Sequence, residues 1–158
     1  MYSAEVISAW FVNKGIDTGN FITQMKLQKV IYFANGLCLA LEDKPLVNER
    51  FRAWRYGPVI PEIYSFYKKW GSAPITMKTK IGVEQDGIKL FNLDVFPDNI
   101  ENILNLTWSA TKNVSGEILS GWTHEKGAPW SQHYDEGANN VIPDMDIKKY
   151  FKEKVIKS

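Results

Sequence analysis

The sequence predicts a mainly α (α+β) fold: a single compact helical domain over residues 1–158, with about five to six helices and one small inserted β-hairpin. Two observations lead to this prediction. Apolar residues recur with a period near 3.6 in several segments that begin at a proline or a capping residue. Residues 75–93 instead favour strands on either side of Asp86-Gly87, a common hairpin turn. With 158 residues, 44% of them hydrophobic, the chain is long enough to bury a core.

The first two helices are predicted in the N-terminal part of the chain. One spans about residues 4–14, where Ser3 can cap its start and Gly15 can end it. The second begins after Thr23. Apolar residues cover most of its circumference, so we expect it to be the central helix of the core. Its inward face is predicted to consist of Leu27, Val30, Ile31, Ala34, Leu37, Cys38 and Leu41.

The middle of the chain contains the segment FRAWRYGPVIPEIY, residues 51–64, which we expect to be irregular because two prolines and a glycine fall within five residues. Pro61 suits the first position of a helix that Gly71 closes. The later helices are predicted to begin at Pro97, Ser115 and Pro143. The inward residues of the first and last of these are predicted to be Ile100, Ile103, Leu104, Trp108, Thr111, Ile147, Tyr150 and Phe151.

Charge and composition exclude several classes of protein. The formal net charge is +1, whereas domains that grip a phosphate backbone are usually strongly basic. The N-terminus lacks the pattern of a signal peptide, and no apolar stretch approaches the roughly 20 residues of a membrane span. The only cysteine, Cys38, lies in an apolar run, which fits a reducing compartment. We therefore expect a cytoplasmic protein with no membrane partner.

Both histidines lie in LSGWTHEKGAPWSQHY, residues 119–134. His124 and His133 are nine positions apart, whereas a helical metal pair needs a spacing of four, so no metal site is predicted. No glycine-rich phosphate loop or serine nucleophile motif is present, and the expected cofactors are none. We predict no catalytic residues and no enzyme activity. A hydrolase that uses His124 as general acid or base, perhaps with Glu125, is kept as an alternative.

Cations and aromatic residues alternate at Arg50, Arg52, Trp54, Arg55 and Tyr56. Such a cluster can stack on bases and clamp a single nucleic-acid strand, which gives a second alternative: a phage or mobile-element protein with a nucleic-acid-associated role. The near-neutral charge favours the other interpretation, in which the aromatic residues anchor the core and the arginines pair with carboxylates.

The segment MKLQKVIYFANGLCLALEDKPLVNERFRAWRYGPVIPEIYSFY resembles the signature of the SocA/Panacea antitoxin-like domain family, formerly a domain of unknown function that also occurs in phage-associated proteins. The second half of the chain fits the same pattern, and the motif-bearing region spans about residues 4–151. The fold-defining motif residues are Leu27, Gln28, Lys29, Tyr32, Phe33, Gly57, Pro61, Tyr64, Trp122, Thr123 and Pro129.

The resemblance implies an antitoxin of a bacterial toxin–antitoxin system rather than an enzyme. Members of the family neutralise a cognate protein toxin, encoded by an adjacent gene, through direct binding, and many come from prophages and other mobile elements. One branch acts as an adaptor that delivers its toxin to a cytoplasmic protease. Aromatic residues and arginine are enriched at interface hot spots. The candidate residues for partner binding are therefore Trp54, Arg55, Tyr56, Pro58, His124 and Trp130.

Overall fold

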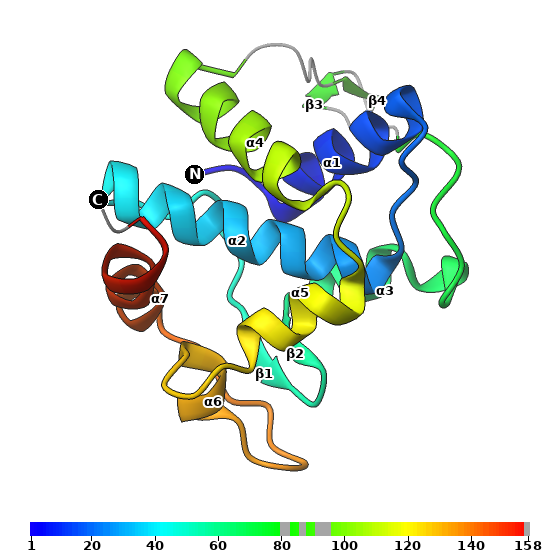
Figure 1. The fold of residues 1–158 in the computed structure, drawn as a ribbon. Coiled ribbons are helices and arrows are strands. Elements are labelled where there is room, and N and C mark those ends of the chain that lie inside the picture. The colour runs from blue at the N-terminus through cyan, green and yellow to red at the C-terminus, as the bar shows by residue number, and fades with distance from the viewer. Residues whose placement is uncertain (80–82, 86–87, 91–95, 157–158) are drawn as a thin grey trace.

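The computed structural model describes residues 1–79, 83–85, 88–90 and 96–156, and it confirms the mainly α fold class (Figure 1). Two small two-stranded antiparallel sheets accompany the helices. The described residues form seven α-helices: α1 (Ala4–Thr18), α2 (Gln24–Glu42), α3 (Pro61–Phe66), α4 (Asp98–Thr111), α5 (Gly116–Thr123), α6 (Pro129–His133) and α7 (Asp144–Tyr150).

Helix α2 crosses the middle of the molecule, as predicted for the core helix. In Figure 1, α1 and α4 lie on one side of it, and α5 lies on the other side with the first hairpin. Helices α4, α5, α7 and α1 all contact it directly. Leu27, Val30 and Ile31 of α2 are fully buried. The predicted inward face is wrong at one position, because Leu41, near the end of the helix, is 51% exposed.

Helix α1 begins as predicted but ends later. The Ser3 hydroxyl accepts a hydrogen bond from the Val6 amide (3.3 Å), which caps the helix. The predicted stop at Gly15 is wrong, because the helix continues to Thr18 and Gly19 caps it with φ of 73°. Gly15 is needed for packing instead. A Cβ atom there would lie 2.6 Å from the carbonyl oxygen of Asn20.

Residues 51–60 are not irregular, which corrects the prediction for this segment. Strand β1 (Arg52–Trp54) pairs with β2 (Gly57–Val59) in an antiparallel hairpin, with Ala53 opposite Pro58. A proline is tolerated here because β2 is an edge strand. On its other side, β1 is joined to the chain near residue 140, since the Ala53 amide donates to the Asn140 carbonyl (2.8 Å).

The one hairpin that the sequence predicts lies between residues 75 and 93. Strands β3 (Val83–Gln85) and β4 (Ile88–Leu90) form an antiparallel pair there, which confirms the prediction. The proposed turn residues Asp86 and Gly87 lie outside the described residues.

Helices α3, α4, α5 and α7 begin where the sequence predicts. The Ser115 hydroxyl caps α5 by accepting a hydrogen bond from the Ile118 amide (3.2 Å). Helix α3 ends at Phe66, and a 3₁₀ turn, η1 (Lys68–Trp70), carries the chain to Gly71. A π-helical turn, η2 (Phe151–Val155), follows α7. The predicted inward residues of α4 and α7 are buried, except Tyr150, which is half-buried. Within the described ranges, no helix is long and apolar enough to cross a membrane.

Candidate functional site

A cleft of about 490 Å³ opens between the first two turns of α2, the β1–β2 hairpin and α3. Helix α2 contributes one wall, and the hairpin and α3 contribute the other. We call this space the α2–hairpin cleft. Its lining residues are Thr23, Gln24, Met25, Gln28, Lys29, Trp54, Arg55, Tyr56, Val59, Tyr64, Gly71, Ser72 and Glu117.

Side-chain amides of α2 hold the two walls in register. Gln28 is buried and bonds in both directions with Ile60: its Nε2 donates to the Ile60 carbonyl (3.2 Å), and its Oε1 accepts from the Ile60 amide (2.9 Å). One turn earlier, the Gln24 amide nitrogen faces the carbonyls of Ile63 (3.2 Å) and Tyr64 (2.9 Å). Because these bonds are buried, breaking one of them costs more than its net contribution to stability.

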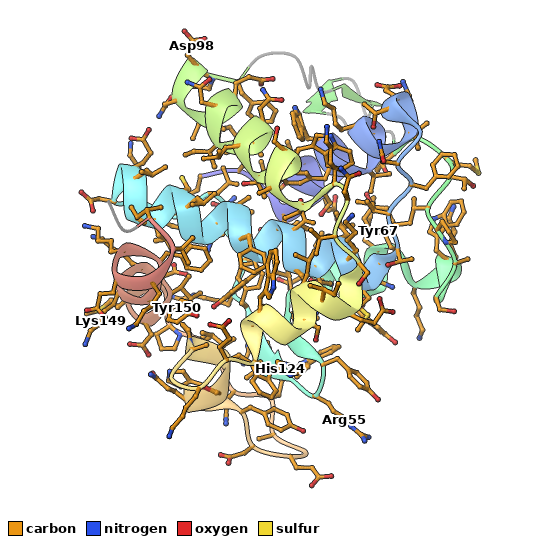
Figure 2. All side chains as sticks on the ribbon, in the orientation of Figure 1. Arg55, Tyr67, Asp98, His124, Lys149 and Tyr150 are labelled. Carbon is orange, nitrogen blue, oxygen red and sulfur yellow. The ribbon has the colours of Figure 1, made fainter. Side chains whose placement is uncertain are left out.

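Aromatic side chains form the outer wall of the cleft. Trp54 packs edge-to-face on Tyr64, with ring centroids 5.5 Å apart. The guanidinium carbon of Arg55 lies 5.4 Å from the centre of the Tyr56 ring. Figure 2 shows Arg55 extending from the hairpin away from the helices. Tyr56 and Tyr64 are 61% and 44% exposed, so both present large apolar area to solvent.

The hairpin turn is fixed from behind by the segment that follows α4. The Ser120 hydroxyl donates to the Tyr56 carbonyl (2.5 Å), and the Trp130 indole N–H donates to the Trp54 carbonyl (2.6 Å). The Trp54 indole N–H donates in turn to Asn139 Oδ1 (2.8 Å). These bonds reach α5, α6 and the loop after α6, so residues distant in sequence determine where the aromatic wall lies.

His124 belongs to this support and does not line the cleft. Its ring stacks on Trp130 (centroids 3.8 Å apart, 15° between planes), and Trp130 stacks on Tyr134 (4.6 Å, 15°). Burial lowers the pKa of His124, and the nearby charge of Lys29 lowers it further, while a backbone hydrogen bond with Tyr56 opposes both effects. His124 Nε2 is buried and has no hydrogen-bond partner among the described residues. In this arrangement the His124 ring packs as part of the support behind the hairpin.

Lys29 is a buried cation on the wall of the cleft. The residue is 1% exposed, and burial lowers its pKa from 10.5 to about 8. Its Nζ donates to the Pro58 carbonyl at 3.4 Å, which is a long hydrogen bond. Gly57 makes room for it: a Cβ atom at Gly57 would lie 2.6 Å from Lys29 Cε and 3.0 Å from Thr123 Oγ1.

The structure brings together three of the six predicted partner-binding residues. Trp54, Arg55 and Tyr56 line the cleft, while His124 and Trp130 lie behind the hairpin. Pro58 is buried within β2, so it offers little accessible surface to a partner. Among the motif residues predicted to define the fold, Gln28, Lys29 and Tyr64 also line the cleft.

The predicted cluster of arginines is dispersed. Arg52 donates to the Asn139 carbonyl (2.9 Å) rather than to a carboxylate. Burial raises the pKa of Asp144, and the nearby charge of Arg50 opposes this shift. Of the three arginines, only Arg55 lines the cleft. This separation gives the nucleic-acid alternative no continuous basic strip on the hairpin.

The two histidines also lie in different surroundings. His133 Nε2 is 2.7 Å from the carboxylate of Asp146 on α7, whereas His124 stacks on Trp130. No group of three or more histidine, cysteine or acidic residues could hold a metal ion within the part of the chain that the structure describes. Cys38 is buried, and burial raises the pKa of its thiol to about 11, with Glu42 adding to the effect.

Several cleft residues were missed at the level of sequence. Met25 lies three and four positions before Gln28 and Lys29 on the same helix face, so its spacing to these two motif residues could have indicated it. Glu117, at the start of α5, reaches the cleft from a distant segment, and no local pattern marks it. A second groove of about 490 Å³ lies between α2, α4, α5 and α7 and includes Phe33, Trp122 and Tyr150.

Comparison with known proteins shows the family to which this α-helical chain belongs. The family model for the Antitoxin SocA-like, Panacea domain matches residues 27–131, more than half of the chain. Antitoxin SocA from Caulobacter vibrioides (strain NA1000 / CB15N) is 31% identical over 143 residues, which cover 86% of this chain and 70% of that protein. No solved structure matches the chain significantly. The chain belongs to the SocA-like, Panacea-domain antitoxin family, and this membership supports an antitoxin role of a non-enzymatic, regulatory kind.

Proposed function

We propose that this protein neutralises a cognate protein toxin by binding it at the α2–hairpin cleft. The observation that carries the proposal is the outer wall of the cleft, where Trp54, Tyr56, Tyr64 and Arg55 meet. These residue types dominate the energetics of protein interfaces, and Tyr56 and Tyr64 are among the exposed large side chains of the described residues. Binding there would cover the surface that the toxin needs for its own activity.

The second groove is the rival surface, and the charge of Lys29 favours the α2–hairpin cleft over it. Most residues of both surfaces fall within positions 27–131, the part of the chain that matches the family model, so this match does not separate them. The cleft contains a buried cation that lacks an ion-pair partner among the described residues, and the second groove does not.

The experiment begins with the gene adjacent to the one that encodes this chain. We expect its product to be toxic when expressed alone, harmless when co-expressed with this chain, and recovered with it in stoichiometric amounts. The double variant Tyr56→Ala, Tyr64→Ala should weaken binding at least tenfold and restore toxicity, because each truncated hot-spot side chain typically costs more than about 1 kcal/mol.

Trp122→Ala is the matched control, since Trp122 is 42% exposed but lies in the second groove. It should leave toxin binding unchanged. Loss of binding in Trp122→Ala with retention in the double tyrosine variant would assign the interface to the second groove and contradict the proposal. Equal levels of the toxin with and without this chain would indicate neutralisation by binding alone. A lower level of the toxin in the presence of this chain would indicate delivery to a protease.

A further inference from the structure

The ammonium group of Lys29 has less compensation than a buried charge normally has. It can donate three hydrogen bonds, yet its described contact is one long bond to the Pro58 carbonyl (3.4 Å). No carboxylate of the described residues forms an ion pair with it, and desolvation is the cause of its altered pKa. A buried charge without a partner is unfavourable, and an acidic group from another molecule would relieve this cost by pairing with it.

Neighbouring groups fix this side chain and do not neutralise it. Gly57 packs against its Cε, and Gln28, the residue before it, anchors the helix to Ile60. His124 lies close enough for the two groups to influence each other, and burial and the Lys29 charge both hold its pKa below its ordinary value. Among these neighbouring groups, Lys29 is therefore the one that carries a charge.

The rest of the cleft determines what kind of group can approach. Met25, Trp54, Val59 and Tyr64 provide apolar and aromatic walls. Two exposed side chains of opposite charge also line it, Arg55 from the hairpin and Glu117 from α5. A ligand that fits this arrangement has an apolar body and one negative charge.

We infer that the cleft receives an aspartate or glutamate side chain of the partner protein, next to an apolar residue, and that its carboxylate pairs with Lys29. This inference rests on the proposed function, because it takes the partner to be the toxin. The carboxylate supplies the acceptor that Lys29 lacks, and the adjoining apolar residue packs on Trp54 and Tyr64. The selectivity for an acidic residue comes from the buried cation, and the affinity comes from the aromatic walls.

The test uses small probes, so it is independent of the toxin. The full-length protein, labelled with ¹⁵N, is titrated with 3-phenylpropionate and with 3-phenylpropionamide, which has the same shape but no charge. We expect the carboxylate to shift the indole signal of Trp54 and to bind at least tenfold more tightly than the amide. Equal affinities for the two probes, or binding of neither, would overturn the inference.

Three variants identify the cation responsible. Lys29→Met should remove the preference for the carboxylate, whereas Arg55→Met should retain most of it. Lys26→Met is the matched control on the same helix, because Lys26 bonds to the Lys112 carbonyl (2.9 Å) and does not line the cleft. A preference that survives in Lys29→Met and disappears in Arg55→Met would also overturn the inference. If Lys29→Met does not fold, the comparison of the two probes on the unaltered protein still decides whether the cleft prefers a carboxylate. The co-expression experiment on the toxin fails or succeeds separately from this one.

Discussion

At the scale of single residues, the least expected feature is a lysine side chain that is only 1% exposed. A sequence pattern assigns polar residues of an amphipathic helix to its outer face. Gln28, Lys29 and Asn35 of α2 break this rule, since all three are buried. Each has a local reason: the two amides bond to the backbone of Ile60 and Leu46, and Lys29 bonds to Pro58. Their hydrogen-bond partners lie outside α2, and hydrophobic periodicity within the helix does not predict where those segments pack.

Lys29→Met is expected to be more stable than the unaltered protein at pH 7, because lowering a lysine pKa from 10.5 to about 8 corresponds to roughly 3 kcal/mol of unfavourable charge burial. Below pH 8 both the folded and the unfolded protein hold the proton, so the full penalty applies. Between pH 8 and 10.5 the unfolded state binds more protons, and the stability of the unaltered protein rises. Chemical denaturation at several pH values measures the difference.

The advantage of Lys29→Met should therefore shrink as the pH rises from 8 to 10.5. Burial raises the pKa of Tyr32, Tyr67 and Cys38, and this lowers stability in the same range. The effect is common to both proteins and cancels in their difference. Lys149→Met, at an exposed position, should change stability by less than about 0.5 kcal/mol. An advantage of Lys29→Met that stays constant across this range would contradict a buried, protonated Lys29.

At the scale of elements, the β1–β2 hairpin determines the shape of the cleft. Its tight turn is followed by Gly57, whose φ of 124° is a conformation that side chains other than glycine rarely adopt. The same residue packs on Lys29 and Thr123. One glycine thus joins the hairpin to both α2 and α5.

Gly57→Ala is expected to destabilise the protein by about 2–4 kcal/mol, because backbone strain adds to a steric conflict with Lys29 and Thr123. Gly127→Ala separates the two effects: its φ is also positive, at 84°, but a Cβ atom there would meet nothing within 4 Å. It should cost only about 1 kcal/mol of strain. Thermal or denaturant unfolding measures both values, and equal costs for the two variants would show that close packing at Gly57 is unimportant.

The elements themselves were largely predictable, because their starts carry strong local signals. Ser3, Thr23 and Ser115 cap α1, α2 and α5 as the sequence indicates, and Pro61 occupies the first position of α3. The β1–β2 hairpin was missed for a physical reason. Its prolines and glycine suggest irregular structure locally, and the bonds that order it come from residues 120–140. The aromatic residues of the cleft could be predicted, but the cleft could not, because its walls are more than 20 residues apart along the chain.

At the scale of the whole molecule, α2 is the scaffold on which the other helices assemble. The C-terminal segment reaches it through Phe151, which is fully buried against α2. Gly36 allows this close approach, since a Cβ atom at that position would overlap the Phe151 ring. The end of the described chain thus packs on a helix more than 100 residues earlier.

Gly36→Ala is expected to lower the free energy of unfolding by about 1–3 kcal/mol, since overpacking at Phe151 outweighs the better helix propensity of alanine. Gly121→Ala is expected to change the free energy of unfolding in the opposite direction. It lies within α5 with open space around it, so the same change should stabilise the protein by up to about 1 kcal/mol. Urea denaturation of both variants tests the pair. Stabilisation by Gly36→Ala would show that Phe151 can move away at little cost.

The central position of α2 has a consequence for synthesis on the ribosome. This helix emerges early, but most of the surface that covers it is supplied by α4, α5 and α7, between residues 98 and 150. Until those residues have been translated, the apolar surface of α2 remains largely open to chaperones and proteases. Each new molecule therefore passes through a vulnerable interval between the translation of residue 42 and that of residue 150, and a pause in elongation before residue 98 prolongs it.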